Sequence, residues 1–196
     1  MRKILLFVWA CMGLVCLMSA CKTSVKSKEW KLVWVEDFDQ KNSFDESVWT
    51  KIPRGTSDWN NYMSYYDSCY AMQDGNLILR GIANHTQKND TAPYLTGGVY
   101  TKGKKLFTGG RVEVCARLQA AKGAWPAIWM LPEKAEWPKG GEIDIMERLN
   151  HDRIAYQTTH SYYTHVLGIK DNPPHGGINK INPEEYNIYS VDIYPD

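Results

Sequence analysis

Short runs of alternating apolar and polar residues recur along the chain. Residues 111–118 show the pattern clearly, because Val112, Val114, Ala116 and Leu118 are each separated by one other residue. Side chains of a strand point alternately to its two faces, so these four are expected to face a core. Runs of this length between Gly, Pro and Asn turns are typical of an antiparallel sandwich or barrel. The pattern predicts an all-β fold without helices, with strands at 75–83, 97–102, 111–118, 125–131, 142–148, 154–164 and 186–194.

The run at 142–148 carries three acids among strong β-formers. Glu142 and Asp144 share one face of a strand, whereas strict alternation sends Glu147 to the other. A β-bulge that absorbs Ile145 and Met146 would return Glu147 to the first face, and bulges are common beside active sites. The two Glu carboxyls could then approach to the roughly 5–5.5 Å at which a pair of acids cleaves a glycosidic bond with retention. The alternative is a polar outer face paired with Lys and Arg of a neighbouring strand.

Two tryptophan-containing segments precede the acidic run. Residues 123–132 read GAWPAIWMLP, and Trp125 and Trp129 fall on one face by the period of two. Trp137 follows in the sequence EWPKGG. Indoles are a common platform for the apolar faces of sugar rings, although a pair of tryptophans is more often part of a core. A glycan-binding role and a packing role therefore both remain open from these residues alone.

The pattern GxWPAIWMLP followed by WPxGGEIDIME resembles glycoside hydrolase family 16, the laminarinase and licheninase group. The similarity extends more weakly over residues 30–196. The resemblance implies a β-sandwich of the jelly-roll type with a concave substrate cleft. It also implies an endo-acting, retaining β-glycanase that hydrolyses β-1,3- or mixed-linkage β-1,3/1,4-glucan. The alternatives are a hydrolase of a marine galactan, agar or porphyran, and a non-catalytic surface protein that binds glycans.

The resemblance also implies roles for single residues. Glu142 would be the nucleophile, Glu147 the general acid/base, and Asp144 the carboxylate that assists them. The segment 54–66 combines amides and aromatics and resembles the family segment that lines the glycone side of the cleft, although a loop without a role is the alternative. Arg54 in this segment is a cation near the expected cleft, so a sulfated galactan remains an alternative substrate. The residues expected to bind substrate are Arg54, Trp59, Asn60, Asn61, Trp125, Trp129, Trp137 and His160.

No cofactor and no catalytic metal are expected, because the histidines match no tetrahedral spacing and no HExxH motif is present. Asp37 and Gly75 resemble positions that hold a structural calcium in some family members. The C-terminal ligand of that calcium would lie beyond Asp196, so the site would be incomplete. Family members continue through further strands, and the resemblance therefore implies that residues 30–196 are a catalytic domain that lacks its C-terminal strands.

Residues 1–21 resemble the signal segment of a bacterial lipoprotein. Basic Arg2 and Lys3 precede an apolar run at 4–17, and Cys21 follows small residues. A transmembrane helix is the alternative, for which the run is a little short. We expect lipidation at Cys21, a flexible tether at 22–29, and a location in the bacterial cell envelope, anchored by lipid to the outer membrane and facing the periplasm or the surface.

The charge balance adds little to this picture. Loss of Arg2 and Lys3 would reduce the 23 basic residues to 21, against 22 acidic ones, so no nucleic-acid partner is expected. Roughly 175 residues after the signal suffice for one core, and we expect a monomer that acts on a polysaccharide. Cys69 and Cys115 would remain, either paired or as buried thiols.

Overall fold

The computed structural model describes residues 30–40 and 42–194. The chain divides into two compact units, Met1–Lys31 and Leu32–Asp196. The expected signal segment, Cys21 and the tether at 22–29 lie outside the described residues. The described segment contains no helix with the length and hydropathy that a membrane span requires.

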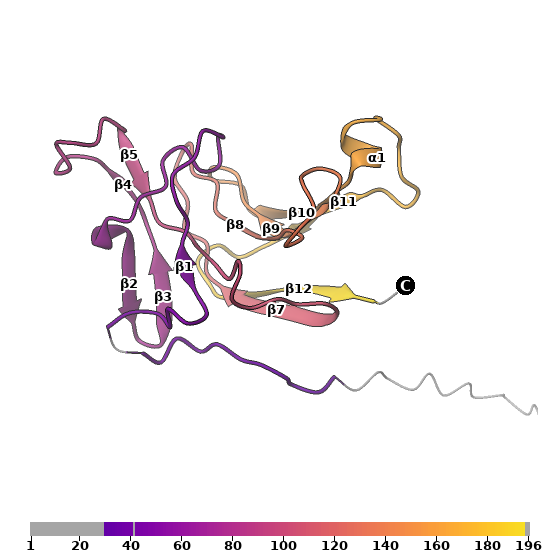
Figure 1. The fold of residues 1–196 in the computed structure, drawn as a ribbon, viewed down its shortest axis with the longest axis horizontal. Coiled ribbons are helices and arrows are strands. Elements are labelled where there is room, and N and C mark those ends of the chain that lie inside the picture. The colour runs from indigo at the N-terminus through magenta and orange to yellow at the C-terminus, as the bar shows by residue number, and fades with distance from the viewer. Residues whose placement is uncertain (1–29, 41, 195–196) are drawn as a thin grey trace, which may run out of the picture. The chain divides into compact units, whose positions relative to one another are not determined.

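The second unit is almost entirely β-structure, as the alternating pattern predicts, and its paired strands are antiparallel (Figure 1). A four-stranded sheet has the order β11–β10–β9–β8, and β7 pairs with β12. Its strands are β8 (Ala127–Met130), β9 (Glu142–Glu147), β10 (Ile154–His160) and β11 (Gly176–Lys180), and the pair consists of β7 (Gly110–Ala116) and β12 (Asn187–Ile193). The smaller pairs are β1 (Thr50–Lys51) with β6 (Val99–Tyr100), β2 (Tyr70–Gln73) with β3 (Asn76–Leu79), and β4 (Gly81–Ala83) with β5 (Tyr94–Thr96).

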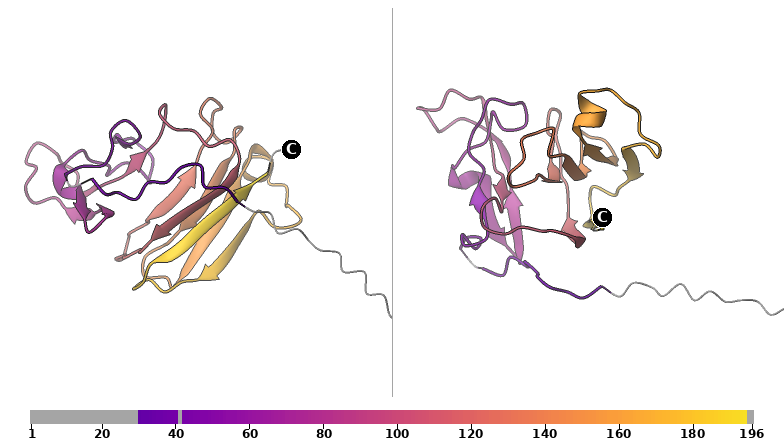
Figure 2. Two further views of the ribbon diagram at one scale, coloured as in Figure 1. Left: turned by 90° about the horizontal axis from the view of Figure 1, so that it is seen from below. Right: turned by 45° about the vertical axis from the view of Figure 1, so that its right-hand side comes forward.

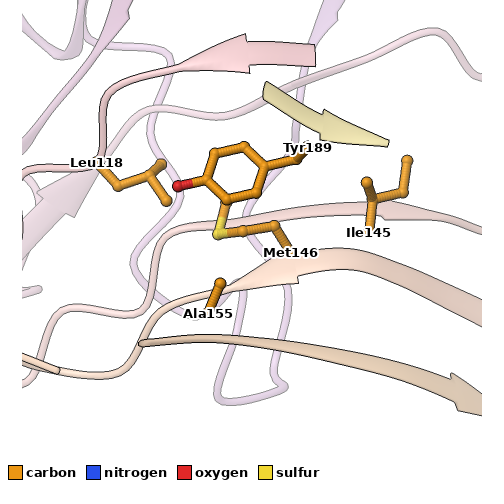
Figure 3. Packing of buried hydrophobic residues seen from close by; sticks show 5 residues of the cluster. All are labelled: Leu118, Ile145, Met146, Ala155 and Tyr189. Atoms are coloured by element: carbon orange, nitrogen blue, oxygen red, sulfur yellow. The ribbon is translucent and has the colours of Figure 1, made fainter. Parts of the chain in front are cut away.

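The core lies between the β7–β12 pair and one face of the four-stranded sheet. Tyr189 of β12 points toward Met146 of β9 and Ala155 of β10, with Leu118 and Ile145 on either side (Figure 3). All five side chains are buried. The strands of the pair and of the sheet run in similar directions, as expected for aligned packing of two sheets (Figure 2). Burial of one face of β9 leaves its other face available for polar side chains.

Most expected strands are confirmed, but three expectations are wrong. The run at 75–83 is interrupted at Arg80 and forms two strands, β3 and β4, which pair with different partners. The run at 154–164 ends as a strand at His160, and a short helix, α1 (Tyr162–His165), follows. Ser161 caps this helix: its side chain accepts from the backbone N–H of Thr164, and the Thr164 hydroxyl accepts from that of Ser161. Such a capping box favours a helical turn over a strand. Because α1 is present, the expectation of a fold without helices is also wrong. A 3₁₀ turn, η1 (Asp67–Cys69), is present as well.

The two cysteines of the second unit are unpaired. Cys69 is a buried free thiol and Cys115 an exposed one. The disulfide that the sequence left open is therefore absent, and burial holds for Cys69 alone.

Candidate active site

A β-bulge in β9 places the three acids on one face of the sheet. On β10, Gln157 alone lies opposite Ile145 and Met146, whereas the flanking residues pair one to one. The same irregularity interrupts the pairing of β9 with β8. The side-chain Nε2 of Gln157 donates to the backbone carbonyl of Ile145 at 3.0 Å, which fixes the bulge. The bulge predicted from Glu142, Asp144 and Glu147 is confirmed.

Each catalytic candidate glutamate receives a hydrogen bond from an indole. Trp137 Nε1 donates to Oε2 of Glu142 at 2.7 Å, and Trp125 Nε1 donates to Oε1 of Glu147 at 2.8 Å. Hydrogen bonds to a carboxylate are short and strong, so both side chains are held in place. Among residues 30–40 and 42–194, no Lys or Arg forms an ion pair with these acids. The acids are therefore not a polar face balanced by basic neighbours.

Asp144 lies between the two glutamates and is the most deeply buried of the three. Its side chain is 5% exposed, and its Oδ2 lies 3.1 Å from Nε2 of His160. Burial, followed by the charges of Glu147 and Glu142, raises the pKa of Asp144 to about 7. Desolvation and like charges both disfavour the ionised form. The site therefore holds a proton on Asp144 through much of the pH range below neutrality.

Two glycines before β9 allow Trp137 to fold back over the nucleophile candidate. Gly141 has a φ of +79°, and a Cβ there would lie 3.3 Å from the backbone oxygen of His160. At Gly140, a Cβ would lie 2.5 Å from Pro132 and 2.6 Å from Ala135. Both positions exclude larger residues, because the turn is tight and Gly141 has a left-handed conformation. This explains the GG that precedes the acidic strand.

The structure brings Trp59 and Trp129 together. Their ring centroids are 5.4 Å apart in an edge-to-face arrangement, so the 54–66 segment reaches β8. Trp129 lies opposite Asp144 in the pairing of β8 with β9 and shares its face. His160 likewise lies opposite Glu142. These aromatic residues border the acids, as their assignment to substrate binding requires.

The polar residues of the 54–66 segment are placed differently. Arg54 forms a bidentate pair with Asp90, which lies outside this segment, at 2.7 Å for both bonds, so its guanidinium already has a carboxylate partner. Asn60 accepts from the backbone N–H of Ser57 at 3.1 Å, which is a local turn contact. Among the described residues, no partner is found for the buried Oδ1 of Asn61. Arg54 and Asn60 thus make contacts within the protein, and the Asn61 oxygen is enclosed by it.

His165 was not assigned to the site from sequence. Its ring centroid lies 4.5 Å from that of Trp137 and 6.1 Å from that of His160. In the sequence, the histidines match no complete tetrahedral metal site, so their pattern gives His165 no role. The available signal was the Ser161 and Thr164 pair, which predicts a turn directly after the strand that carries His160.

Two groups of oxygen and nitrogen atoms bear on metal binding. Glu142, Asp144 and His160 offer three atoms that all lie within 4.8 Å of one another, a spacing that could also hold a cation. The backbone oxygen of Asp37 lies 3.9 Å from the position of a Cβ at Gly75. The two positions named for a structural calcium are therefore neighbours, and calcium binding there stays a prediction.

The bulged acidic strand and its indole partners form the candidate active site, and comparison with known proteins identifies the family of this chain. The model of an XgeA-like, catalytic GH16 domain matches residues 60–185. This chain belongs to glycoside hydrolase family 16.

Relatives and a solved structure agree with this membership. The keratan-sulfate endo-1,4-beta-galactosidase of Sphingobacterium multivorum is 37% identical over 174 residues, which are 86% of this chain and 40% of that protein. The beta-glucanase of Rhodothermus marinus is 31% identical over 193 residues, 92% of this chain and 65% of that protein. The X-ray structure of the laminarinase from Rhodothermus marinus matches with a TM-score of 0.73 and 30% identity, covering 85% of this chain and 69% of that one. The match to this chain spans less than two thirds of the length of the galactosidase and of the beta-glucanase.

Proposed function

We propose that this protein is an endo-acting, retaining β-glycanase that hydrolyses β-1,3- or mixed-linkage β-1,3/1,4-glucan. The observation that carries the proposal is the bulge in β9, which sets Glu142, Asp144 and Glu147 on one face with an indole N–H on each glutamate. A double-displacement glycosidase uses two neighbouring carboxyl groups, one as nucleophile and one as general acid/base.

In the first step, Glu142 attacks the anomeric carbon and forms a glycosyl ester. The bond from that carbon to the leaving oxygen breaks, and Glu147 donates its proton to that oxygen. In the second step, Glu147 removes a proton from water, the water oxygen attacks the anomeric carbon, and the Glu142 carboxylate leaves. Two inversions at one carbon give retention.

The surrounding residues support these steps. Trp137 binds Oε2 of Glu142, which leaves Oε1 for the attack. A protonated Asp144 between the glutamates places no third negative charge beside the attacking carboxylate. Trp59 and Trp129 offer ring faces and edges to a glucan chain.

A β-galactan is the second candidate substrate. It is supported by the 37% identity to a keratan-sulfate endo-1,4-beta-galactosidase. Glucan is preferred because the further relatives include a beta-glucanase and a glucan endo-1,3-beta-glucosidase. In addition, Arg54, the residue that could bind the sulfate groups of a galactan, already forms an ion pair with Asp90.

Release of reducing ends tests the proposal. The substrates are laminarin, barley β-glucan, lichenan, agarose, porphyran and keratan sulfate, each with the parent protein and with Glu142→Gln. We expect turnover of laminarin or of the mixed-linkage glucans by the parent alone, and retained glycan binding by Glu142→Gln. Turnover of only a galactan would establish the second candidate. Binding without turnover of any glycan would contradict an enzymatic function and favour a surface glycan-binding protein.

We also propose that the protein is anchored by lipid in a bacterial cell envelope. The support is the basic start, the apolar run at 4–17 and Cys21 in the sequence. Metabolic labelling with a fatty acid in a bacterial host should mark the parent and not Cys21→Ala. Equal labelling of both proteins would contradict the proposal.

A further inference from the structure

Trp137 contacts both Glu142 and another aromatic side chain. The Trp137 indole donates to Oε2 of Glu142 at 2.7 Å, but Trp137 is 47% exposed and lies outside the strands, in the segment that leads into β9. An exposed side chain in such a segment has rotameric freedom, which weakens its hold on a carboxylate. The orientation of Glu142 therefore depends on what packs against the other side of the indole.

His165 is the residue packed there. Its ring meets that of Trp137 with centroids 4.5 Å apart and an interplanar angle of 62°. Aromatic rings in offset or edge-to-face arrangements at such distances stabilise each other beyond the area that they bury. The same ring lies 6.1 Å from His160, whose Nε2 is near Asp144. His165 thus lies beside Trp137, the partner of Glu142, and near His160, the partner of Asp144, although it belongs to neither β9 nor β10.

The turn that carries His165 is held by its own hydrogen bonds. Ser161 follows the last residue of β10 directly, and its capping box with Thr164 fixes the start of α1. The backbone N–H of His165 donates to the carbonyl of Ser161 at 2.8 Å, and that of Val166 to Tyr162 at 3.0 Å. These bonds tie the position of the imidazole to the end of the sheet that carries the acids.

We propose that His165 is a positioning residue for the nucleophile. It holds the Trp137 indole in the orientation that binds Glu142, and the Ser161-capped turn α1 holds His165. The inference rests on the proposed function for its kinetic consequence, but the contact itself can be measured without substrate. Loss of the imidazole frees the indole, and the Glu142 carboxylate then samples orientations that cannot attack.

The test compares His165→Ala, His165→Phe and His175→Ala with the parent. Phenylalanine retains a flat ring against the indole. His175 is a control histidine in the same connection between β10 and β11. Its imidazole lies 3.9 Å from Asp171, and the hydrogen bond that its backbone carbonyl accepts from Thr159 survives the substitution. The first readout is the indole N–H resonance of Trp137, assigned with Trp137→Phe, and its rate of exchange with solvent. The second is kcat and KM on laminarin.

In His165→Ala, we expect the Trp137 N–H resonance to shift and to exchange faster. We also expect kcat to fall about tenfold, equivalent to about 1.4 kcal/mol of barrier, with KM changed by less than about twofold. His165→Phe should recover most of both losses, and His175→Ala should match the parent.

An unchanged Trp137 resonance in His165→Ala would overturn the inference, whatever the kinetics. A raised KM at the parental kcat would also overturn it, because His165 would then bind substrate instead of positioning the nucleophile. If the parent hydrolyses no glycan, the proposed function fails, and the resonance still decides whether His165 positions the indole.

Discussion

Asp144 is a buried acid between two other acids, and it makes the site sensitive to pH. Its side chain is 5% exposed, and its raised pKa of about 7 follows from burial and from the charges of Glu147 and Glu142. Below about pH 4 both the folded and the unfolded chain bind a proton on Asp144. Between about pH 4 and 7 the folded chain alone retains it, so this residue lowers the free energy of unfolding as the pH rises.

Replacement of Asp144 by Asn should therefore change how stability depends on pH. We expect the free energy of unfolding of Asp144→Asn, relative to the parent, to increase from pH 4 to pH 7.5 by up to about 4 kcal/mol. Urea unfolding at several pH values measures the difference, with the exposed acid Asp58 replaced by Asn as control. Parallel pH profiles for Asp144→Asn and the parent would show that the folded chain does not hold this proton.

At the scale of elements, the bulge in β9 determines where Glu147 points. Gln157 of β10 spans it: Nε2 donates to the Ile145 carbonyl at 3.0 Å, and Oε1 accepts from Asn179 of β11 at 2.7 Å. One side chain thus connects the irregular part of β9 to two further strands. Without it, the carbonyl of the bulge would lose its side-chain partner.

Gln157→Leu should destabilise the fold by about 1 kcal/mol, because the Ile145 carbonyl is left without that bond. Its kcat should fall more than its KM rises, since the bulge orients an acid that acts in the transition state. Chemical denaturation and steady-state kinetics measure the two effects. Asn179→Ala removes the outer bond alone and should have the smaller effect on both. Equal effects of the two substitutions would show that Gln157 does not secure the bulge.

The shape of β9 could be predicted from the sequence because a few adjacent residues carry all the information. In a regular strand, Glu147 would face away from Glu142 and Asp144. Three acids that must share one face require an extra residue, and Ile145 with Met146 supplies it. Prediction failed for β11, whose sequence GGINK is exposed throughout and carries no alternation of apolar and polar residues. The strand exists because it pairs with β10, which is information from the rest of the chain. His165 was missed for the same reason, since its partner Trp137 is distant in sequence.

At the scale of the whole molecule, apolar side chains remain on exposed strands. Ile188 of β12 is 71% exposed and Ile178 of β11 is 61% exposed. Each strand lies at the end of its sheet among residues 32–194, and exposed apolar edges promote association between chains. The charge is also close to zero, at 21 basic and 22 acidic residues without Arg2 and Lys3, so repulsion between molecules is weak.

Ile188→Lys should therefore reduce self-association without disturbing the core, because Ile188 lies on the outer face of the β7–β12 pair opposite exposed Cys115. Static light scattering over a concentration series measures the effect. Ser190→Lys, on the same strand, provides a control for added charge alone. A parent that stays monomeric at all concentrations, with no difference in Ile188→Lys, would contradict this expectation.

The central claim is the assignment of Glu142 as nucleophile and Glu147 as general acid/base. The most direct test is azide rescue of Glu147→Ala with a substrate that carries a good leaving group. Such a substrate needs no protonation to form the glycosyl ester on Glu142, and azide needs no general base to attack that ester. We predict restored turnover and a β-glycosyl azide, the product of two inversions. An α-glycosyl azide would transfer the nucleophile role to Glu147, and the order of the two residues would have to be reversed.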